Sequence, residues 1–235
     1  MRKPMRKPIV SSTETKTAIN EEPIKEPRGA RRKRKTRQKL LNAALRLMAE
    51  NGMEGVSINE ITEEADVGFG SFYNHFPSKE AIYETLQEEM IGQFGDAIDA
   101  QLALIEDPAE KISVALRHTM LHANHNRDWA KFLIREGFSI QAMSSGLGSR
   151  LARDVSQGMI SGRFRKYDPE IQVLSIGATT LAWMSIQLQS PTANDEKNFG
   201  ERLVQSSLIN LGIAEDEASQ ISQVPLPAAI EDDSL

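Results

Sequence analysis

The sequence of 235 residues contains no cysteine, and this absence excludes several kinds of chemistry. Without thiols there is no disulfide framework, no thiolate metal site and no thiol nucleophile. An apolar run of the length that spans a membrane is also lacking. The basic N-terminus leads into serine, threonine and glutamate where a secretory signal would have an apolar segment. We therefore expect a cytoplasmic protein with no membrane partner.

Catalytic motifs are missing as well. The chain has no phosphate-binding glycine loop, nucleophile elbow, His-Glu-x-x-His motif or pair of catalytic carboxylates. The spacing of His118, His122 and His125 places three imidazoles near one face of a helix, with Asp128 close behind, where they could bind a transition metal. Exposed or capping histidines near a helix end are common, and this is the alternative. We predict no enzyme activity, no metal and no cofactor.

The net charge of −5 hides an asymmetry along the chain. The first 35 residues hold 12 lysines and arginines against 4 glutamates, whereas the remainder is strongly acidic. Residues 1–33 mix prolines with polar residues without apolar periodicity, which predicts a disordered basic arm. The basic run at 31–35 could reach DNA phosphates or an adjacent minor groove. The alternative is a solvated run of charge that aids solubility.

The most informative stretch, residues 57–79, predicts two short helices joined by a tight turn and followed by a third. Ser57 and Glu60 have the spacing of a capping box at the start of the first helix. An Asp-Val-Gly turn ends that helix, and Phe72 and Phe76 then lie on one buried face of the next. Rings and hydrogen-bonding side chains are left exposed. A short exposed helix braced by a second one is the geometry that enters a DNA major groove.

This stretch and its flanks resemble the DNA-binding domain of the TetR/AcrR family of bacterial transcriptional regulators. The resemblance covers about sixty residues, from Arg34 to Phe94, and beyond them the chain matches only in helical character and length. The matching residues are Asn51-Gly52, Gly55-Val56-Ser57-Ile58, Ile61, Ala65, Val67, Gly70, Phe72-Tyr73, His75-Phe76 and Ser78-Lys79-Glu80-Ala81.

We predict an all-α chain, because apolar residues recur at helical spacing and no segment alternates with period two. About nine helices are expected, near residues 36–51, 57–66, 68–76, 78–105, 109–125, 128–141, 145–164, 169–189 and 195–211. The predicted organisation is a disordered arm at 1–33, a three-helix DNA-binding domain at 34–94 with its helix-turn-helix at 57–76, a helical effector-binding and dimerisation domain at 95–213, and a flexible acidic tail at 214–235.

The resemblance implies three sets of DNA contacts. Phosphates at helix N-termini are assigned to Arg37 and Ser57. The backbone on either side of the groove is assigned to Tyr73, His75 and Lys79. Base edges are assigned to Gly68, Phe69, Ser71 and Asn74, of which Asn74 could pair with adenine and Phe69 could pack on a thymine methyl. Gly68 and Phe69 depart from the family pattern, which often has Ser or Thr at the first position and a polar residue at the second.

The resemblance also implies a homodimer on an inverted repeat of double-stranded DNA and a largely apolar small-molecule effector. Residues expected at the dimer interface are Leu174, Leu181, Trp183, Met184, Leu188, Leu203 and Leu208, unless the helix at 169–189 is only monomer core. Residues expected around the effector are Met120, His122, Trp129, Phe132, Leu133, Phe138 and Met143, with Arg135 and Glu136 as further polar anchors, unless these are plain core.

The sequence thus favours a DNA-binding transcriptional regulator, a repressor released from its operator by a small molecule. Two alternatives stay open. The body could be a helical ligand-binding protein or enzyme in which the helix-turn-helix is incidental. The chain could also be an architectural protein that binds DNA without sequence preference through its basic arm.

Overall fold

The computed structural model describes residues 27–137, 144–190 and 198–227, and these ranges are helical without any strand. The prediction of an all-α fold is confirmed. The elements in chain order are α1 (Arg28–Asn51), α2 (Ile58–Glu64), α3 (Phe69–Phe72), α4 (Lys79–Leu86), η1 (Gln87–Gly92), α5 (Gln93–Leu102), α6 (Pro108–His125), α7 (Arg127–Glu136), α9 (Gly146–Ile160), α10 (Pro169–Gln189), α11 (Phe199–Asn210) and α12 (Glu215–Gln223).

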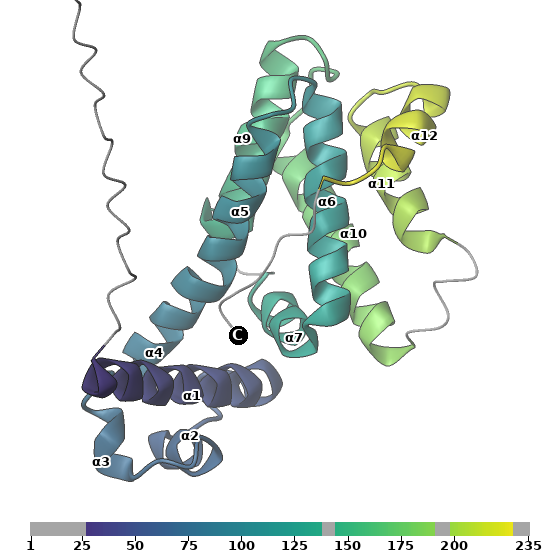
Figure 1. Ribbon diagram of the computed structural model, residues 1–235. Helices are drawn as coiled ribbons and strands as arrows, with labels where there is room; N and C mark the ends of the chain where they lie inside the picture. The colour runs from purple at the N-terminus through teal and green to yellow at the C-terminus, as the bar shows by residue number, and fades with distance from the viewer. Residues whose placement is uncertain (1–26, 138–143, 191–197, 228–235) are drawn as a thin grey trace, which may run out of the picture.

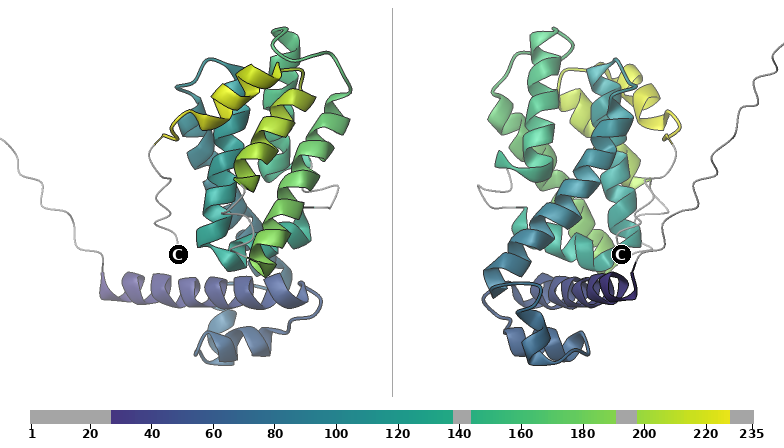
Figure 2. Two further views of the ribbon diagram at one scale, coloured as in Figure 1. Left: turned by 90° about the vertical axis from the view of Figure 1, so that its right-hand side faces the viewer. Right: turned by 60° about the vertical axis from the view of Figure 1, so that its left-hand side comes forward.

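The molecule has an N-terminal head and a helical body joined by one rod. Helices α1, α2 and α3 form the head, and α4, η1 and α5 continue from it into the body as one nearly unbroken rod (Figure 1). Helices α6, α9, α10 and α11 run alongside in the body, while α7 lies across their lower end against α1 (Figures 1 and 2). The rod was predicted as one helix, but its middle section, η1, is π-helical.

Local capping chemistry starts the helices of the head where the sequence predicted. The Ser57 hydroxyl accepts a hydrogen bond from the Glu60 amide at 3.2 Å, and the Glu60 carboxylate accepts one from the Ser57 amide at 2.8 Å. The capping box is therefore confirmed. Ser78 caps α4 in the same way, by accepting from the Ala81 amide at 3.2 Å. Gly52, with a φ of 74°, ends α1 in a conformation that disfavours other residues.

The first helix begins earlier than predicted. α1 starts at Arg28, immediately after Pro27, so residues 28–33 are helical and do not belong to an extended arm. Arginine and lysine have high helix propensity, and the helix needs no apolar face at its exposed end. The lack of apolar periodicity in residues 28–33 thus reflects an exposed helix and not a disordered segment. The rest of the predicted arm, residues 1–26, lies outside the described residues.

The C-terminal segment also differs from the prediction of a flexible tail. Residues 215–223 form α12, which buries Ala218 and Ile221 against the body. The Ile221 carbonyl accepts a hydrogen bond from Ser113 at 3.2 Å. Helix propensity and one i, i+3 apolar pair are enough to form α12, because α6 and α11 already provide the surface on which it packs.

A clasp of charged residues holds the end of the body far from the head. The Arg163 guanidinium donates to both oxygens of Asp107, at 2.7 and 2.8 Å, and to Glu217 at 2.8 Å. Asp107 also caps α6 through the Ala109 amide, and the hydrogen bond from Arg163 keeps its pKa below the ordinary value. One guanidinium thus joins the α5–α6 turn, the α9–α10 connection and α12.

Helix α10 is long and apolar enough to cross a membrane by length and composition, with a mean hydropathy of 1.3. This differs from the expectation that the chain holds no apolar segment of that length. The helix packs in the body against α6, α7, α9 and α11, and the core helix of a bundle meets the same criterion. Its composition therefore fits a position between several neighbours.

Candidate DNA-binding surface and effector cavity

The recognition helix α3 is short and exposes aromatic side chains. Phe72 is fully buried, whereas Phe69 and Tyr73 are 51% and 52% exposed. The rings of Phe69 and Tyr73 meet edge to face with centroids 5.7 Å apart, so they form one outward-facing pair. Asn74 is exposed beside them. The side chains assigned to base edges and to one backbone clamp are thus brought together on one accessible surface.

His75 lies in a less accessible position than the other predicted contacts. Its Nδ1 is buried and has no hydrogen-bond partner among the residues that the structure describes. Burial, together with the nearby charges of Lys33 and Arg37, lowers the pKa of His75 below its ordinary value. The lowered pKa favours the neutral imidazole, so we expect any phosphate contact to be a hydrogen bond that a ring N–H donates to a phosphate oxygen.

Arg37 forms a contact between helices that the sequence did not predict. Its guanidinium donates two hydrogen bonds to the Glu89 carboxylate, at 2.9 and 2.6 Å, and lies 5.3 Å from the centroid of the Phe76 ring. The hydrogen bonds to Glu89 raise the pKa of Arg37. This bidentate pair joins α1 to η1 and so connects the head to the rod, while the phosphate contact assigned to Arg37 stays a prediction.

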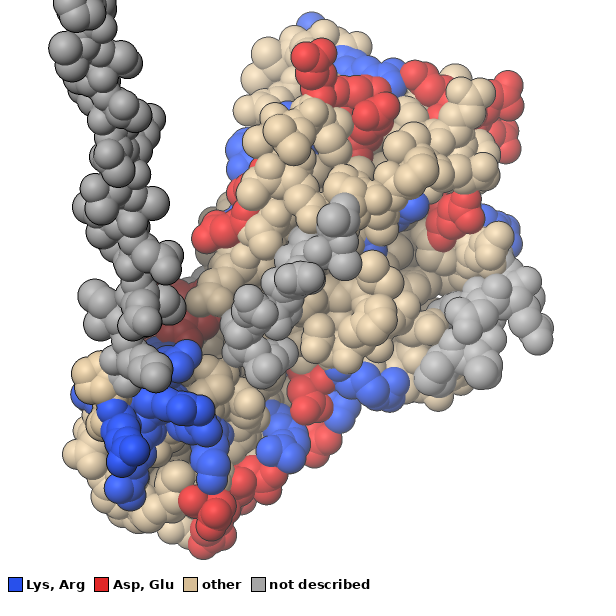
Figure 3. All heavy atoms as spheres, viewed as in Figure 1, with Lys and Arg blue, Asp and Glu red and all other residues tan. Residues whose placement is uncertain are grey.

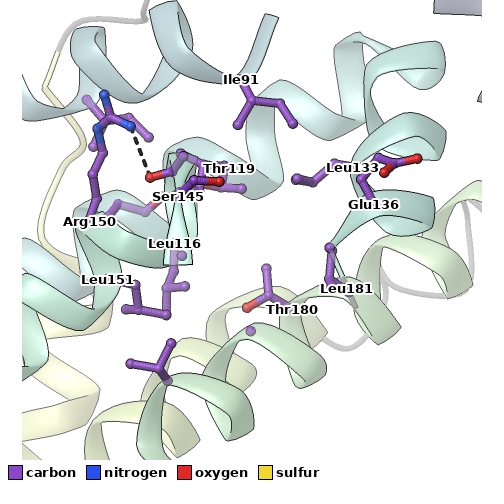
Figure 4. A pocket seen from close by; sticks show the side chains of 18 of the residues that line it. Ile91, Leu116, Thr119, Leu133, Glu136, Ser145, Arg150, Leu151, Thr180 and Leu181 are labelled. Carbon is purple, nitrogen blue, oxygen red and sulfur yellow. Dashed lines mark hydrogen bonds between the residues drawn. The ribbon is translucent and has the colours of Figure 1, made fainter. Parts of the chain in front are cut away.

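A cavity of about 680 Å³ lies in the body between the rod, α6, α7, α9 and α10 (Figure 4). Its volume is within the ~300–1,000 Å³ typical of small-molecule sites. Most of its wall is apolar. The apolar side chains that line it include Ile91, Ile98, Leu102, Ile112, Leu116, Leu133, Leu147, Leu151, Val173, Leu181 and Met184.

The sequence located this cavity only in part. Of the predicted lining residues, Leu133 lines it, while the four others that the structure describes are buried in neighbouring core: Met120, His122, Trp129 and Phe132. The His122 ring lies between Phe94 and Trp129, with centroids 4.4 and 4.6 Å away. Because both aromatic neighbours pack against the His122 ring, its faces are not accessible to a ligand. Phe138 and Met143 lie outside the described residues.

One side of the cavity holds a charged cluster from the rod and α9. Arg150 donates to Asp99 at 2.9 Å and also to Asp96, while Arg153 donates to Asp99 at 2.7 Å and to the buried Asp154 at 2.8 Å. Burial alone would raise the pKa of Asp99, but the hydrogen bonds from Arg153 and Arg150 outweigh it and lower the pKa. Both Asp99 and Asp154 are therefore hydrogen-bond acceptors on the cavity wall, paired with arginines.

The opposite side of the cavity is acidic too. Glu136 faces Arg150 across the cavity (Figure 4) and accepts a hydrogen bond from the Tyr83 hydroxyl. Burial and this hydrogen bond raise the pKa of Tyr83, so its proton is retained. Glu84 and Glu88 also line the cavity. Of the suggested polar anchors, Glu136 lines the cavity, whereas Arg135 donates to the Glu50 carbonyl at 3.3 Å.

The three histidines of α6 do not converge. His118 and His122 are buried, whereas His125 is exposed and its Nδ1 lies 2.8 Å from the Leu121 carbonyl oxygen. No group of three metal-ligating side chains occurs within residues 27–137, 144–190 and 198–227. Helical spacing placed the three rings near one face, but their burial differs too much for a common ligand.

Most of the predicted interface residues are buried within their own chain. Leu181, Trp183, Met184 and Leu208 are at most 7% exposed, so their assignment to a dimer surface is corrected to core or cavity wall. Leu188 and Leu203 are half-buried. Leu174 is 47% exposed and follows Ile171 by one turn. Periodicity could not separate inner from outer positions because α10 is apolar nearly all round.

Comparisons with known proteins match this geometry over both parts of the chain. Residues 40–86 match the family model of bacterial regulatory proteins of the tetR family, and residues 107–224 match the model of the tetracyclin repressor-like C-terminal domain. The crystal structure of RolR in complex with resorcinol is similar with a TM-score of 0.63 and 32% identity, covering 85% of this chain and 99% of that one.

Sequence relatives match over less than half of this chain. The regulator UidR of Escherichia coli is 32% identical over 87 residues, which is 35% of this chain and 43% of UidR. YvdT of Bacillus subtilis, an uncharacterised helix-turn-helix regulator, is 29% identical over 91 residues, 39% of this chain and 47% of its own. The chain thus spans about half the length, or less, of these relatives.

Proposed function

Since this chain belongs to the TetR family of DNA-binding, ligand-responsive transcriptional regulators, we propose that it is a homodimeric repressor released from an inverted-repeat operator by a small hydroxylated aromatic compound. As a regulator of bacterial genes it would act in the cytoplasm. The base and backbone contacts proposed for it are those of Ser57, Gly68, Phe69, Ser71, Tyr73, Asn74, His75 and Lys79.

The observation that carries this proposal is the double role of η1. Gln87, Glu88, Ile91 and Gly92 of this short section line the cavity. Glu89, between them, holds Arg37 of α1 through the bidentate pair. A ligand in the cavity therefore touches the same turn and a half of helix that positions the head.

Release requires that the ligand bind one arrangement of η1 better than another. The two heads of a dimer must place their recognition helices in successive major grooves, about 34–36 Å apart. A π-helical section differs from an α-helix in its hydrogen-bond register and is frequent at functional sites. A ligand-dependent change in η1 would move Glu89, and through Arg37 it would tilt the head away from the spacing that the operator needs.

The chemistry of the cavity supports a neutral ligand with hydroxyl donors. Among the described residues, the cavity is lined by five carboxylates and one guanidinium, that of Arg150. The carboxylates belong to Glu84, Glu88, Asp99, Glu136 and Asp154. Arg150 is already bonded to Asp96 and Asp99. An anionic ligand would meet like charge, whereas phenolic hydroxyls can donate to the carboxylates and an aromatic ring suits the leucine-rich wall. The similar structure of RolR contains such a compound, resorcinol.

The test is release of DNA by matched compounds. An operator duplex is first selected from random DNA, and its binding by the full-length protein is then followed by fluorescence anisotropy. We expect resorcinol or its more apolar derivative 4-hexylresorcinol to weaken binding, and 1,3-dimethoxybenzene and benzoate to have no effect. Release by benzoate but by neither diol would overturn the proposed effector class, and failure to select any preferred duplex would overturn the proposed function.

The proposed dimer surface is the exposed apolar stripe of α10, represented by Ile171, Leu174 and Ile186, which are 46–49% exposed. Leu174 stands at the edge of this stripe and also lines the cavity. A second copy of the same stripe would bury these side chains in a symmetric contact. We expect Ile171→Glu combined with Ile186→Glu to produce monomers in analytical ultracentrifugation and to weaken operator binding. Leu104→Glu, at an 89% exposed position in the α5–α6 turn, is the matched control and should stay dimeric.

A further inference from the structure

The N-terminal half of α1 carries a stripe of positive charge that the DNA-binding motif does not account for. Its members are Arg28, Arg31, Arg32, Lys35 and Lys39, all exposed. Their spacing of i, i+3, i+4, i+7 and i+11 places them on one face of the helix, over a length of about 16 Å. Lysine and arginine side chains gather at this end of the head in the space-filling view (Figure 3).

A groove of about 510 Å³ separates this stripe from the recognition helix. Its other wall consists of the turn at Asp66, Val67 and Gly68 and of Ser71 in α3. Within the described part of the chain, Arg28, Arg31, Arg32 and Lys35 form no ion pair, and Lys39 lies 3.8 Å from Asp66. Like charges at i, i+4 destabilise a helix. The groove is therefore suited to an anion from outside the chain.

We infer that this groove binds DNA backbone phosphates beside the half-site, so that each subunit holds DNA by α1 as well as by α3. The inference rests on the proposed function, because the groove opens beside the helix that we place in the major groove. The groove is lined by Gly68, the N-cap residue of α3. This favours a phosphate of the duplex that α3 contacts over a free phosphate ion. Exposed cationic side chains next to a groove-binding helix are the usual donors to such phosphates.

The helical state of the basic run decides which part of the DNA it contacts. An α-helix with its side chains is about 10–12 Å wide, whereas the minor groove of B-DNA is about 6 Å wide. An extended arm can enter that groove, but α1 cannot. The stripe therefore contacts phosphates along the outside of the duplex and reads no bases.

The salt dependence of DNA binding tests this inference. We compare the wild-type protein, a variant with Arg31→Ala, Arg32→Ala and Lys35→Ala, and a control with Lys111→Ala, Arg165→Ala and Lys166→Ala at the opposite end of the body. Loss of three phosphate contacts should reduce the slope of log K against log salt by about 2.7. The control, with the same loss of charge, should keep the wild-type slope. The preference for operator over random DNA should be unchanged in both, because phosphate contacts carry no sequence information.

A second variant tests the same groove by strengthening it. Asp66 is the one acidic side chain lining the groove in the described residues, and that side chain is 99% exposed. Its φ of 53° is tolerated by asparagine. Asp66→Asn should therefore leave the fold intact and tighten binding to operator and random DNA alike, by about threefold.

The outcomes separate this inference from the proposed function. An unchanged slope in the triple variant, or an unchanged affinity in Asp66→Asn, would overturn the inference even if the operator is bound well. The flanking A·T pairs can also be replaced by G·C pairs. If the difference in salt slope between the wild-type protein and the triple variant then disappears, the inference is overturned in favour of contacts in the minor groove. Equal binding of operator and random DNA by the wild-type protein would overturn the proposed function, while the slope on random DNA would still decide the inference.

Discussion

The head and the body of this protein are both built from helices around buried leucine, isoleucine and phenylalanine side chains, but they arrange their functional residues differently. In the head, the capping box, the turn and the exposed rings all fall within residues 57–79. In the body, the cavity is lined by residues from Glu84 to Met184 on the rod, α6, α7, α9 and α10. A surface made by one short segment depends on local structure, whereas a cavity depends on packing between distant segments. The ligand can therefore change by substitution in the wall without altering the DNA-contacting surface.

The largest expected effect separates packing from DNA contact within α3. Phe72 is fully buried and Phe69 is 51% exposed, three residues apart on the same helix. Phe72→Ala should lower the free energy of unfolding by about 3–5 kcal/mol and abolish operator binding. Phe69→Ala should change stability by less than about 0.5 kcal/mol but weaken operator binding roughly tenfold. Denaturant titration and anisotropy measure both. Equal loss of stability in the two variants would show that Phe69 is structural.

A second prediction concerns the body alone. Gly177 lines the cavity, and a Cβ added there meets no atom within 4 Å. Gly177→Leu should fill the cavity and lower ligand affinity at least ~10-fold, because the new side chain occupies ligand volume. Operator binding should persist, so the variant would repress without responding to ligand. Gly177→Ala is the matched control: it gives the same gain in helix propensity, about 1 kcal/mol, with little loss of volume. A normal ligand response in Gly177→Leu would place the effector elsewhere.

The connection between the two regions gives the next prediction. Glu89→Gln weakens the contact with Arg37 that spans α1 and η1. Ligand affinity and operator affinity measured separately should stay near wild type, whereas the ligand-induced loss of operator affinity should shrink roughly fivefold, about 1 kcal/mol of coupling.

Glu64→Gln is the matched control for this coupling, because it removes a 3.0 Å ion pair with Arg46 that lies wholly inside the head. It should leave the ligand response unchanged. Equal effects of the two variants would mean that the coupling runs through a different contact.

The smallest expected effect is the dependence of stability on pH. Burial, and secondarily the charge of Arg117, lowers the pKa of His118, whose Nε2 has no partner in the part of the chain that the structure describes. The unfolded histidine titrates near ~6.5. The folded state binds the proton less readily, so stability is present above that pH and is lost as pH falls through the lowered pKa. Thermal unfolding should therefore shift to lower temperature between pH 7.5 and 5.5.

His118→Leu should remove the part of the pH-dependent loss of stability that comes from His118 in the body. The part that comes from His75 in the head should remain. Thermal melts of the variant at both pH values measure the difference. An unchanged pH dependence would mean that the acid sensitivity resides in the head or in other groups.

The difference between the regions also explains what the sequence could predict. The cap at Ser57, the turn before Phe69 and the burial of Phe72 follow from neighbours in the chain, and the structure agrees with all three. The DNA contacts themselves stay predictions. For α1, the start at Arg28 was missed because an exposed polar helix has no apolar stripe.

In the body, apolar residues at helical spacing are the same whether they fill a core or line a cavity. Leu181 and Trp183 lie two residues apart on α10, yet one borders the cavity and the other does not. Contacts such as Arg37 with Glu89 join residues 52 apart in sequence, and no periodicity in either helix identifies the partner. The charged wall at Asp99 and Arg150 was missed for the same reason, since each residue alone resembles an ordinary surface charge.

The Arg163 clasp has a practical consequence for finding the effector. Because one guanidinium ties together three distant parts of the body, including α12, those parts should unfold together. A compound that occupies the cavity then stabilises the whole body by mass action, by about 2.7 kcal/mol at a hundred times its dissociation constant. A shift of that size is readily detected as a rise in melting temperature. Compounds can therefore be screened on the free protein, before any promoter sequence is known.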